Sequence, residues 1–229
     1  MKSDIVINHV HLETELVISS ETTQLLIIEN PSEFYSLVSM LYKQIEGEEG
    51  DFIFLANNQP INCSKSAFMI VDLFNFDLND KKIVNLLYKK LEGVAINEKY
   101  SKLSELNSVV VSFLEDLTFS VPFSLDYGEI QPIDFFKSAS LKFEKTYDTL
   151  LEKIICYVNA LIELKGCEFF VFVNLKGVLS DTELSMLYKH CSLEQVGLLL
   201  IENSKCRQLL PNEKAVIITE DLCEIVENY

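Results

Sequence analysis

The stretch from Glu168 to Thr219 constrains the fold most, because three strand-length apolar runs there enclose a helical pattern. The runs are 169–174, 197–201 and 215–219. Aromatic and β-branched residues without polar alternation are typical of strands buried on both faces. Between the first two runs, Ser180 and Glu183 have the spacing of a capping box, and apolar residues then recur at helical spacing. This order predicts a βαβ unit, and therefore a doubly wound α/β core with a mostly parallel sheet.

The first quarter of the chain predicts the same class of fold. An apolar run at 25–30 is followed by Asn30 as a helix N-cap, Pro31 at the first helical position and Glu33 as a capping-box acid. Two further strand-like runs lie at 52–55 and 68–71. We expect these strands to share one sheet with the last third of the chain.

The middle of the chain is helical, without intervening strands. We expect Asn79 to cap a helix that ends near Gly93, a longer helix over 103–117, a brief one from Pro132, and a long one over 147–162. Helices without strands predict a lobe inserted into the α/β domain. The predicted domains are an α/β head, 1–77 with 146–229, and a helical leg, 78–145.

Composition indicates a soluble protein. No apolar run approaches the roughly 18 residues that a membrane span requires, and the N-terminus lacks the pattern of a secretory signal. We therefore expect a cytoplasmic location and no membrane partner. The cysteines form no CxxC pair, and we interpret them as structural thiols. They are Cys63, Cys156, Cys167, Cys191, Cys206 and Cys223.

The net charge of −16 argues against indiscriminate nucleic-acid binding, because a uniformly acidic surface repels phosphates. The distribution of charge is uneven. Residues 78–145 contain 9 of the 19 basic and 10 of the 35 acidic residues, so their net charge is −1, whereas the rest of the chain carries −15. The basic groups are therefore concentrated in the middle of the chain.

Two other sets of residues suggest metal chemistry. Apolar alternation from Ile5 to Ile18 predicts a strand region with His9 and His11 on one face, a spacing that can chelate a metal. No third ligand stands nearby, so we favour a structural role. The strings LIIEN (26–30) and LLIEN (199–203) nearly repeat.

The acids in these strings, Glu29 and Glu202, fall at strand ends, where they could hold a magnesium ion or polarise a water molecule. The chain has neither GxxxxGKS/T nor GxGxxG and contains only seven glycines, so a phosphate cradle is missing. Because strand-end acids also cap turns, the structural interpretation is again favoured.

Several blocks in order along the chain resemble the Csn family, the accessory protein of type II-A CRISPR loci. The blocks are LIIENP (26–31), IVDLFNFDLN (70–79), LDYGEI (125–130), FFKSASLKFE (135–144) and FVFVN (170–174). The similarity extends over nearly the whole chain from about Leu25, and the first twenty-odd residues match poorly.

This resemblance implies an α/β head with the topology of P-loop ATPases but no working phosphate loop, and a helical leg. It also implies a non-enzymatic protein of spacer acquisition. Its homotetrameric ring would surround double-stranded DNA with a basic inner wall, engage free DNA ends and bind Ca²⁺ that orders the leg. The implied partners are the RNA-guided effector nuclease and the CRISPR integration proteins. A ring with an acidic exterior and inward lysines would reconcile DNA binding with the net charge.

The resemblance also implies site residues. The family's acidic cluster falls on Asp126, Glu129, Asp134 and Glu144, whose oxygens are the hard donors that calcium selects. Gly128 stands where the family has an acid, so one coordination shell is weaker or differently filled. The candidate phosphate contacts are Lys81, Lys82, Lys89, Lys90, Lys137 and Lys142. Lysine contacts carry no sequence readout, which suits a protein that accepts any duplex.

Two alternatives remain open. The protein could be a scaffold of the adaptation complex that touches DNA only incidentally, which the acidic head would favour. It could also be a metal-dependent hydrolase of nucleotides or phosphodiesters that uses Glu29 and Glu202 or the leg acids.

Overall fold

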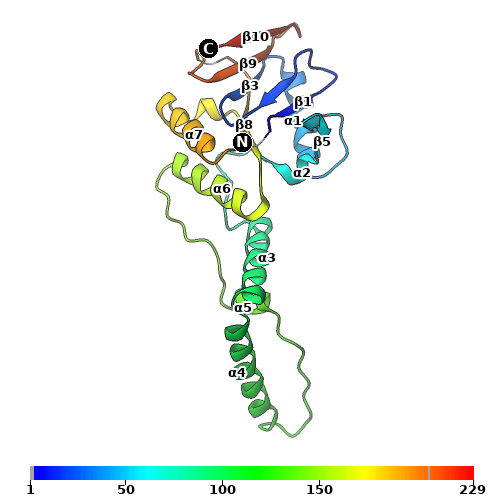
Figure 1. Cartoon of the computed structure of the whole chain (residues 1–229), viewed down its shortest axis with the longest axis vertical. Coiled ribbons are helices and arrows are strands. Elements are labelled where there is room, and N and C mark those ends of the chain that lie inside the picture. The colour runs from blue at the N-terminus through cyan, green and yellow to red at the C-terminus, as the bar shows by residue number, and fades with distance from the viewer. Residues whose placement is uncertain (1–2, 206) are drawn as a thin grey trace. The chain divides into compact units, whose positions relative to one another are not determined.

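The computed structural model describes residues 3–205 and 207–229, so Cys206 lies outside the described residues. The chain forms two compact units, which we call the head (Met1–Asp77 with Thr146–Tyr229) and the leg (Leu78–Lys145). Figure 1 shows the elements of both units. No helix among the described residues is long and apolar enough to cross a membrane.

The head contains all ten strands and four of the α-helices found among the described residues. The strands are β1 (Ile5–Asn8), β2 (Leu16–Ile18), β3 (Thr23–Ile28), β4 (Ile53–Ala56), β5 (Gln59–Pro60), β6 (Ala67–Ile70), β7 (Phe169–Val173), β8 (Gly197–Glu202), β9 (Glu213–Ile218) and β10 (Glu224–Asn228). The helices are α1 (Pro31–Ile45), α2 (Cys63–Ser66), α6 (Leu150–Lys165) and α7 (Asp181–Leu193), with a 3₁₀ turn, η1 (Leu175–Gly177).

The larger sheet has six strands in the order β10-β9-β3-β8-β7-β6, and every neighbouring pair is parallel except β9 with β10. The predicted α/β fold is confirmed, because β7 and β8 are adjacent, parallel and joined by α7. The third run forms β9, which pairs with β3. The strand from the first quarter thus enters the middle of the sheet, and each of its residues is buried.

A second, antiparallel sheet has the strand order β2-β1-β4-β5. The expectation that the run at 52–55 joins the same sheet as the last third is wrong, because it forms β4, which pairs with β1. The strands explain the separation. β1 buries only alternate residues, as suits a sheet covered on one face, whereas β3, β7 and β8 of the larger sheet are buried at every residue.

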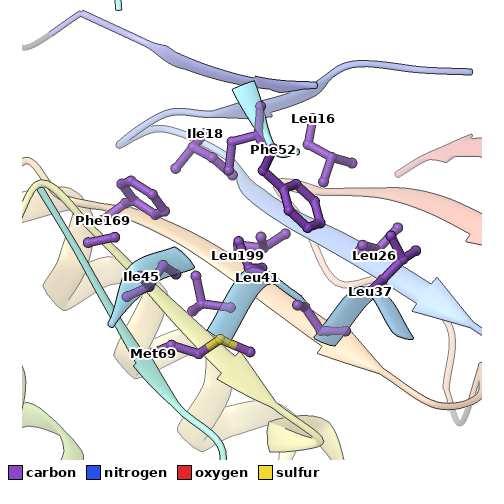
Figure 2. Close-up of a cluster of buried hydrophobic side chains, with 14 of the residues drawn as sticks. Leu16, Ile18, Leu26, Leu37, Leu41, Ile45, Phe52, Met69, Phe169 and Leu199 are labelled. Atoms are coloured by element: carbon purple, nitrogen blue, oxygen red, sulfur yellow. The ribbon is translucent and has the colours of Figure 1, made fainter. Parts of the chain in front are cut away.

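The core of the head lies where the small sheet and α1 meet one face of the larger sheet (Figure 2). The labelled side chains are Leu16, Ile18, Leu26, Leu37, Leu41, Ile45, Phe52, Met69, Phe169 and Leu199. Each buried Leu, Ile or Phe side chain contributes roughly 1.5–3 kcal/mol through removal from water. The two sheets approach each other closely at Gly197 in β8, where a Cβ atom would collide with the side chain of Ile18 in β2.

Helices α6 and α7 cover the other face of the larger sheet. Strand side chains alternate between faces, so Phe170 and Phe172 point away from the core cluster and are fully buried. The ring of Tyr157 in α6 lies 5.7 Å from that of Phe68 in β6, and α7 contacts β8. Figure 1 shows α6 and α7 beside each other. Both faces of the parallel sheet are therefore shielded from water.

A buried ion pair crosses this covered region. Lys176, in η1, places its Nζ 2.7 Å and 2.8 Å from the two carboxylate oxygens of Glu213, and both side chains are nearly inaccessible. Glu213 also accepts hydrogen bonds from the Tyr188 hydroxyl at 2.6 Å and the Leu210 amide at 2.7 Å. Burial, together with the Glu213 carboxylate, raises the pKa of Tyr188, so this phenol stays protonated. The network ties η1, α7 and β9 together.

Glu213→Gln is expected to lower the free energy of unfolding by about 3–5 kcal/mol, because the buried Lys176 ammonium loses the carboxylate that bonds it directly. Adding Lys176→Met should recover part of that loss. The exposed pair between Lys205 and Glu227 is the matched control, and Glu227→Gln should cost less than about 1 kcal/mol. Urea unfolding compares these three variants with the wild type. Equal effects of Glu213→Gln and Glu227→Gln would contradict the assignment.

Candidate nucleic-acid interface of the leg

The leg begins with α3 (Lys81–Asn97), which Asp80 caps by accepting a hydrogen bond from Lys82 N at 2.8 Å. The expectation that Asn79 is the cap is wrong, because Asn79 bonds elsewhere. Its Nδ2 donates to Phe143 O at 3.1 Å, and its Oδ1 accepts from Phe143 N at 2.9 Å. The expected helix end near Gly93 is also wrong, since α3 continues to Asn97. A single glycine costs only about 1 kcal/mol inside a helix.

The returning segment of the leg is attached to α3. It contains α5 (Pro132–Ser138), which starts at Pro132 as predicted. The Tyr88 hydroxyl of α3 donates to Leu141 O at 2.9 Å, and the Tyr88 ring lies 5.8 Å from that of Phe136. Together with Asn79, these contacts hold α5 and residues 139–143 along α3.

All six candidate lysines are exposed. At 3.6 residues per turn, the four in α3 fall within about 180° of the helix circumference. That arc lies opposite the buried Ile83 and Tyr88. Lys137 and Lys142 belong to the segment that Tyr88 and Asn79 hold against α3. The leg thus presents four lysines on one half of the α3 surface and two further lysines, Lys137 and Lys142, on the segment packed beside α3.

The four candidate calcium ligands are exposed and lie on three segments. Asp126 and Glu129 are in the irregular stretch 119–131, Asp134 is in the first turn of α5, and Glu144 is in the irregular stretch 139–149. Asp134 Oδ2 accepts a hydrogen bond from Gln131 N at 3.2 Å, which caps α5.

These carboxylates have the donor chemistry of a calcium site, but they are not assembled as one here. Among the described residues, no three His, Cys, Asp or Glu side chains converge where they could hold a metal ion. Binding by all four would require the two irregular stretches to move. A side chain at Gly128 would meet no atom within 4 Å, so space does not explain the missing acid.

Helix α4 (Tyr100–Thr118) has no buried residue, which the sequence did not predict. Four apolar side chains at spacings of three and four form an exposed stripe. Leu106, Val109, Phe113 and Leu117 are 44%, 67%, 60% and 45% exposed. The periodicity predicts a helix, whereas the covering of its apolar face depends on residues distant in sequence. We call these four residues the α4 stripe.

Of the two strand-end acids of the head, Glu202 has a structural partner for its carboxylate. Glu202 is buried, and its carboxylate accepts a hydrogen bond from Lys176 N at 2.9 Å. Burial raises the pKa of Glu202, while the Lys176 amide and charge oppose this shift. Glu29 is half-buried, and its amide donates to Ile218 O at 2.8 Å. Glu202 therefore anchors the turn after β7.

The turn between β3 and α1 has no room for a phosphate loop. Only Glu29 and Asn30 separate the strand from the helix. The Asn30 side chain accepts hydrogen bonds from the amides of Ser32 and Glu33, each at 3.0 Å. The amides that would otherwise cradle a phosphate at this helix N-terminus are occupied by the helix's own cap.

His9 and His11 do not share a strand face, which corrects that expectation. They lie in the turn after β1, where Leu12 N donates to His9 O at 2.9 Å. His9 Nδ1 accepts from His11 N at 3.2 Å, so the neutral His9 ring carries its proton on Nε2. That nitrogen is buried and has no hydrogen-bond partner. A metal at Nε2 would require the ring proton to move to Nδ1, which already accepts the hydrogen bond from His11 N. The geometry therefore supports a structural histidine.

The thiols behave as expected for structural cysteines only in part. Cys63, Cys167 and Cys191 are buried, and burial raises the pKa of Cys191 to about 12. Cys156 is half-buried, whereas Cys223 is exposed. None of these five forms a disulfide.

Comparison with known proteins decides the family. The family model for CRISPR-associated protein Cas_Csn2 matches residues 44–222. The chain belongs to the Cas_Csn2 family. A CRISPR-associated protein Csn2 from Streptococcus agalactiae is 27% identical over 225 residues, covering 97% of this chain and 98% of that protein. A Csn2 from Enterococcus faecalis is 25% identical over 188 residues, covering 81% and 84%. The resemblance seen in the sequence is thus confirmed, and the protein is CRISPR-associated.

More distant likeness is found among solved structures. A nucleotide-free ATP-binding cassette from an ABC transporter has a TM-score of 0.48 and 11% identity, covering 100% of this Cas_Csn2-family chain and 92% of that chain. A putative ABC transporter ATP-binding protein from Pyrococcus furiosus has a TM-score of 0.41 and 12% identity, covering 93% and 97%. These values are too low to bear on function.

The His9 geometry predicts a pH effect on stability. Burial and the neighbouring His11 lower the pKa of His9 below its ordinary value of 6.5, while Asp51 and Glu33 act in the opposite direction. The unfolded chain therefore binds this proton more readily, and the contribution of His9 to stability is complete above pH 6.5 and declines as the pH falls below it. His9→Asn, which preserves an acceptor for His11 N, should flatten the dependence of the unfolding midpoint on pH. An unchanged slope would refute this role.

Proposed function

We propose that this protein is a non-catalytic ring that binds double-stranded DNA at free ends during CRISPR spacer acquisition. Membership of the Cas_Csn2 family supports a role in CRISPR defence. The observation that carries the DNA-binding part is the exposure of all six leg lysines in a unit whose net charge is −1, within a chain of −16.

The charge distribution gives this proposal a physical basis. Duplex DNA carries about one negative charge per 1.7 Å of its axis, so an acidic surface repels it. A leg near neutrality with lysines grouped on one face of α3 is the part of the molecule that DNA can approach. Because the chain contains a single arginine, the contacts would be point charges on phosphate rather than bidentate base readout.

Calcium belongs to the same proposal. Asp126, Glu129, Asp134 and Glu144 supply hard oxygen donors, and three of them lie on irregular stretches that α3 does not hold along their whole length. Ca²⁺ binding would draw these stretches together and order the leg, with backbone carbonyls and water completing the shell. It would also neutralise carboxylates that otherwise repel phosphate beside Lys137 and Lys142.

Ring formation is supported by the α4 stripe. An apolar face on a helix without a buried residue is costly in water, and an oligomer interface removes that cost. A homotetramer would present several legs around one opening. The lysines of different subunits could then act together on a single duplex.

A scaffold of the adaptation complex remains the second candidate, because the head carries most of the net charge of −16 and would suit basic protein partners. In that case the effector nuclease and integration proteins would be the main partners. Contact with DNA would be incidental.

Retention of linear and closed circular duplexes of one sequence separates the two functions. We expect retention of the linear form alone, lost on chelation of calcium and weakened steeply by salt. Lys81→Glu with Lys89→Glu should reduce the slope of log affinity against log salt by about one for each phosphate contact removed. Lys43→Glu, exposed in the head, is the control. Indifference to topology, calcium and these lysines would favour the scaffold.

The α4 stripe predicts a change in mass. Val109→Glu with Phe113→Glu should reduce the oligomer measured by light scattering in calcium-containing buffer, because two charges would be buried at the interface. Ser104→Glu, exposed on the opposite side of α4, should leave the mass unchanged. A wild-type protein that is a single subunit in calcium would overturn the ring.

A further inference from the structure

Strand β10 is an edge of the large sheet with one unpaired side. Thr219 N donates to Cys223 O at 2.9 Å, and Tyr229 N donates to Glu213 O at 3.3 Å. Because backbone direction alternates along a strand, Ile225 and Glu227 also face β9. The amides and carbonyls of Glu224, Val226 and Asn228 therefore point to the open side, and within the described part of the chain no strand pairs with them.

Neither face of this edge strand is covered as the inner strands are. The side chains of Ile225 and Val226 point to opposite faces of the sheet and are 47% and 51% exposed. Both faces of β10 are therefore partly open to water. A two-sided apolar strand with unpaired backbone groups is a template for another strand. Proteins often blunt such edges with charged side chains, proline or a bulge. β10 has no proline, lysine or bulge, and its charges are those of Glu224 and Glu227, which a basic strand would complement.

A hollow lies at each end of β10. The first, about 300 Å³, is lined by His11, Glu33, Ile218 and Leu222. The second, about 260 Å³, is lined by residues that include Lys205, Leu209 and Glu227. Strand-addition sites use main-chain hydrogen bonds for affinity and pockets beside the edge for specificity. Here each hollow offers an apolar side chain and a carboxylate.

The charge around β10 selects the kind of partner. Residues 213–229 contain five acids and one lysine, so nucleic acid is repelled. The carboxylates of the hollows already have exposed partners, His11 for Glu33 at 2.6 Å and Lys205 for Glu227 at 2.7 Å. Exposed pairs of this kind are worth at most about 1 kcal/mol, so an incoming cation can exchange with them.

We propose that β10 is a docking edge for an extended, basic segment of a partner protein, which adds to the sheet as a further strand. Apolar residues of the segment cover Ile225 and Val226, and lysines or arginines near its two ends occupy the hollows. This inference concerns the head alone and does not rest on DNA binding by the leg.

The probe is a fluorescein-labelled peptide, TKVTVKT, whose binding to the full chain is followed by anisotropy. A peptide with both valines replaced by proline has the same charge but cannot pair, and a peptide with glutamate for lysine reverses the charge. We expect TKVTVKT to bind at least about tenfold more tightly than either control, as the loss of one or two main-chain hydrogen bonds implies.

Two substitutions at one position isolate the main-chain contact. Val226→Pro removes an amide that points away from β9, so the β9 pairing is retained, and it should weaken binding by about tenfold. Val226→Ala keeps the amide and should weaken binding less. If Val226→Pro fails to fold, amide exchange in the wild-type protein replaces it, with the peptide expected to protect Val226 and Asn228 but not to change Ile225.

Three results would overturn the proposal. The first is equal binding of the proline peptide, which would mean that charge alone drives binding, and the second is no protection of the Val226 amide. The third is a smaller oligomer for Val226→Pro without peptide, which would mean that a second copy of the chain already occupies the edge. Loss of DNA retention with peptide binding intact would count only against the proposed function of the leg.

Discussion

Burial of the parallel sheet on both faces is the condition on which the head depends. Strands β3, β7 and β8 are buried along their whole length, so water must be excluded from two faces at once. The small antiparallel sheet and α1 exclude it on one side, and α6 and α7 on the other. The pair of Lys176 and Glu213 lies inside this covered region, where each charge is tolerable only with the other.

The placement of charge, more than its total, decides what this protein can bind. A net charge of −16 alone would exclude nucleic acid, yet the leg carries only −1 of it. Four lysines share the outward half of α3, while Ile83 and Tyr88 occupy the inward half. We therefore propose different classes of partner for the acidic head and the near-neutral leg, basic protein segments for β10 and phosphates for α3.

The turn between β3 and α1 and the turn after β7 are both stabilised by side chains of the head itself. The strand-to-helix turn at Glu29 and Asn30 is capped by its own side chain, and Glu202 is held by the Lys176 amide. The sequence allows Glu29 and Glu202 as metal ligands, because strand ends meet at one edge of a parallel sheet, but it favours a structural role. The hydrogen bond from the Lys176 amide shows that the Glu202 carboxylate stabilises a turn.

By itself, the sequence determined the α/β class, the βαβ unit of β7, α7 and β8, the start of α1 and the family, because local periodicity, caps and ordered blocks are properties of the chain. It did not determine that β4 leaves the large sheet, that Asn79 bonds Phe143, that α4 buries nothing, or that Lys176 meets Glu213. Each of these depends on contacts between residues distant in sequence. Only tertiary structure selects among the partners that a local pattern allows.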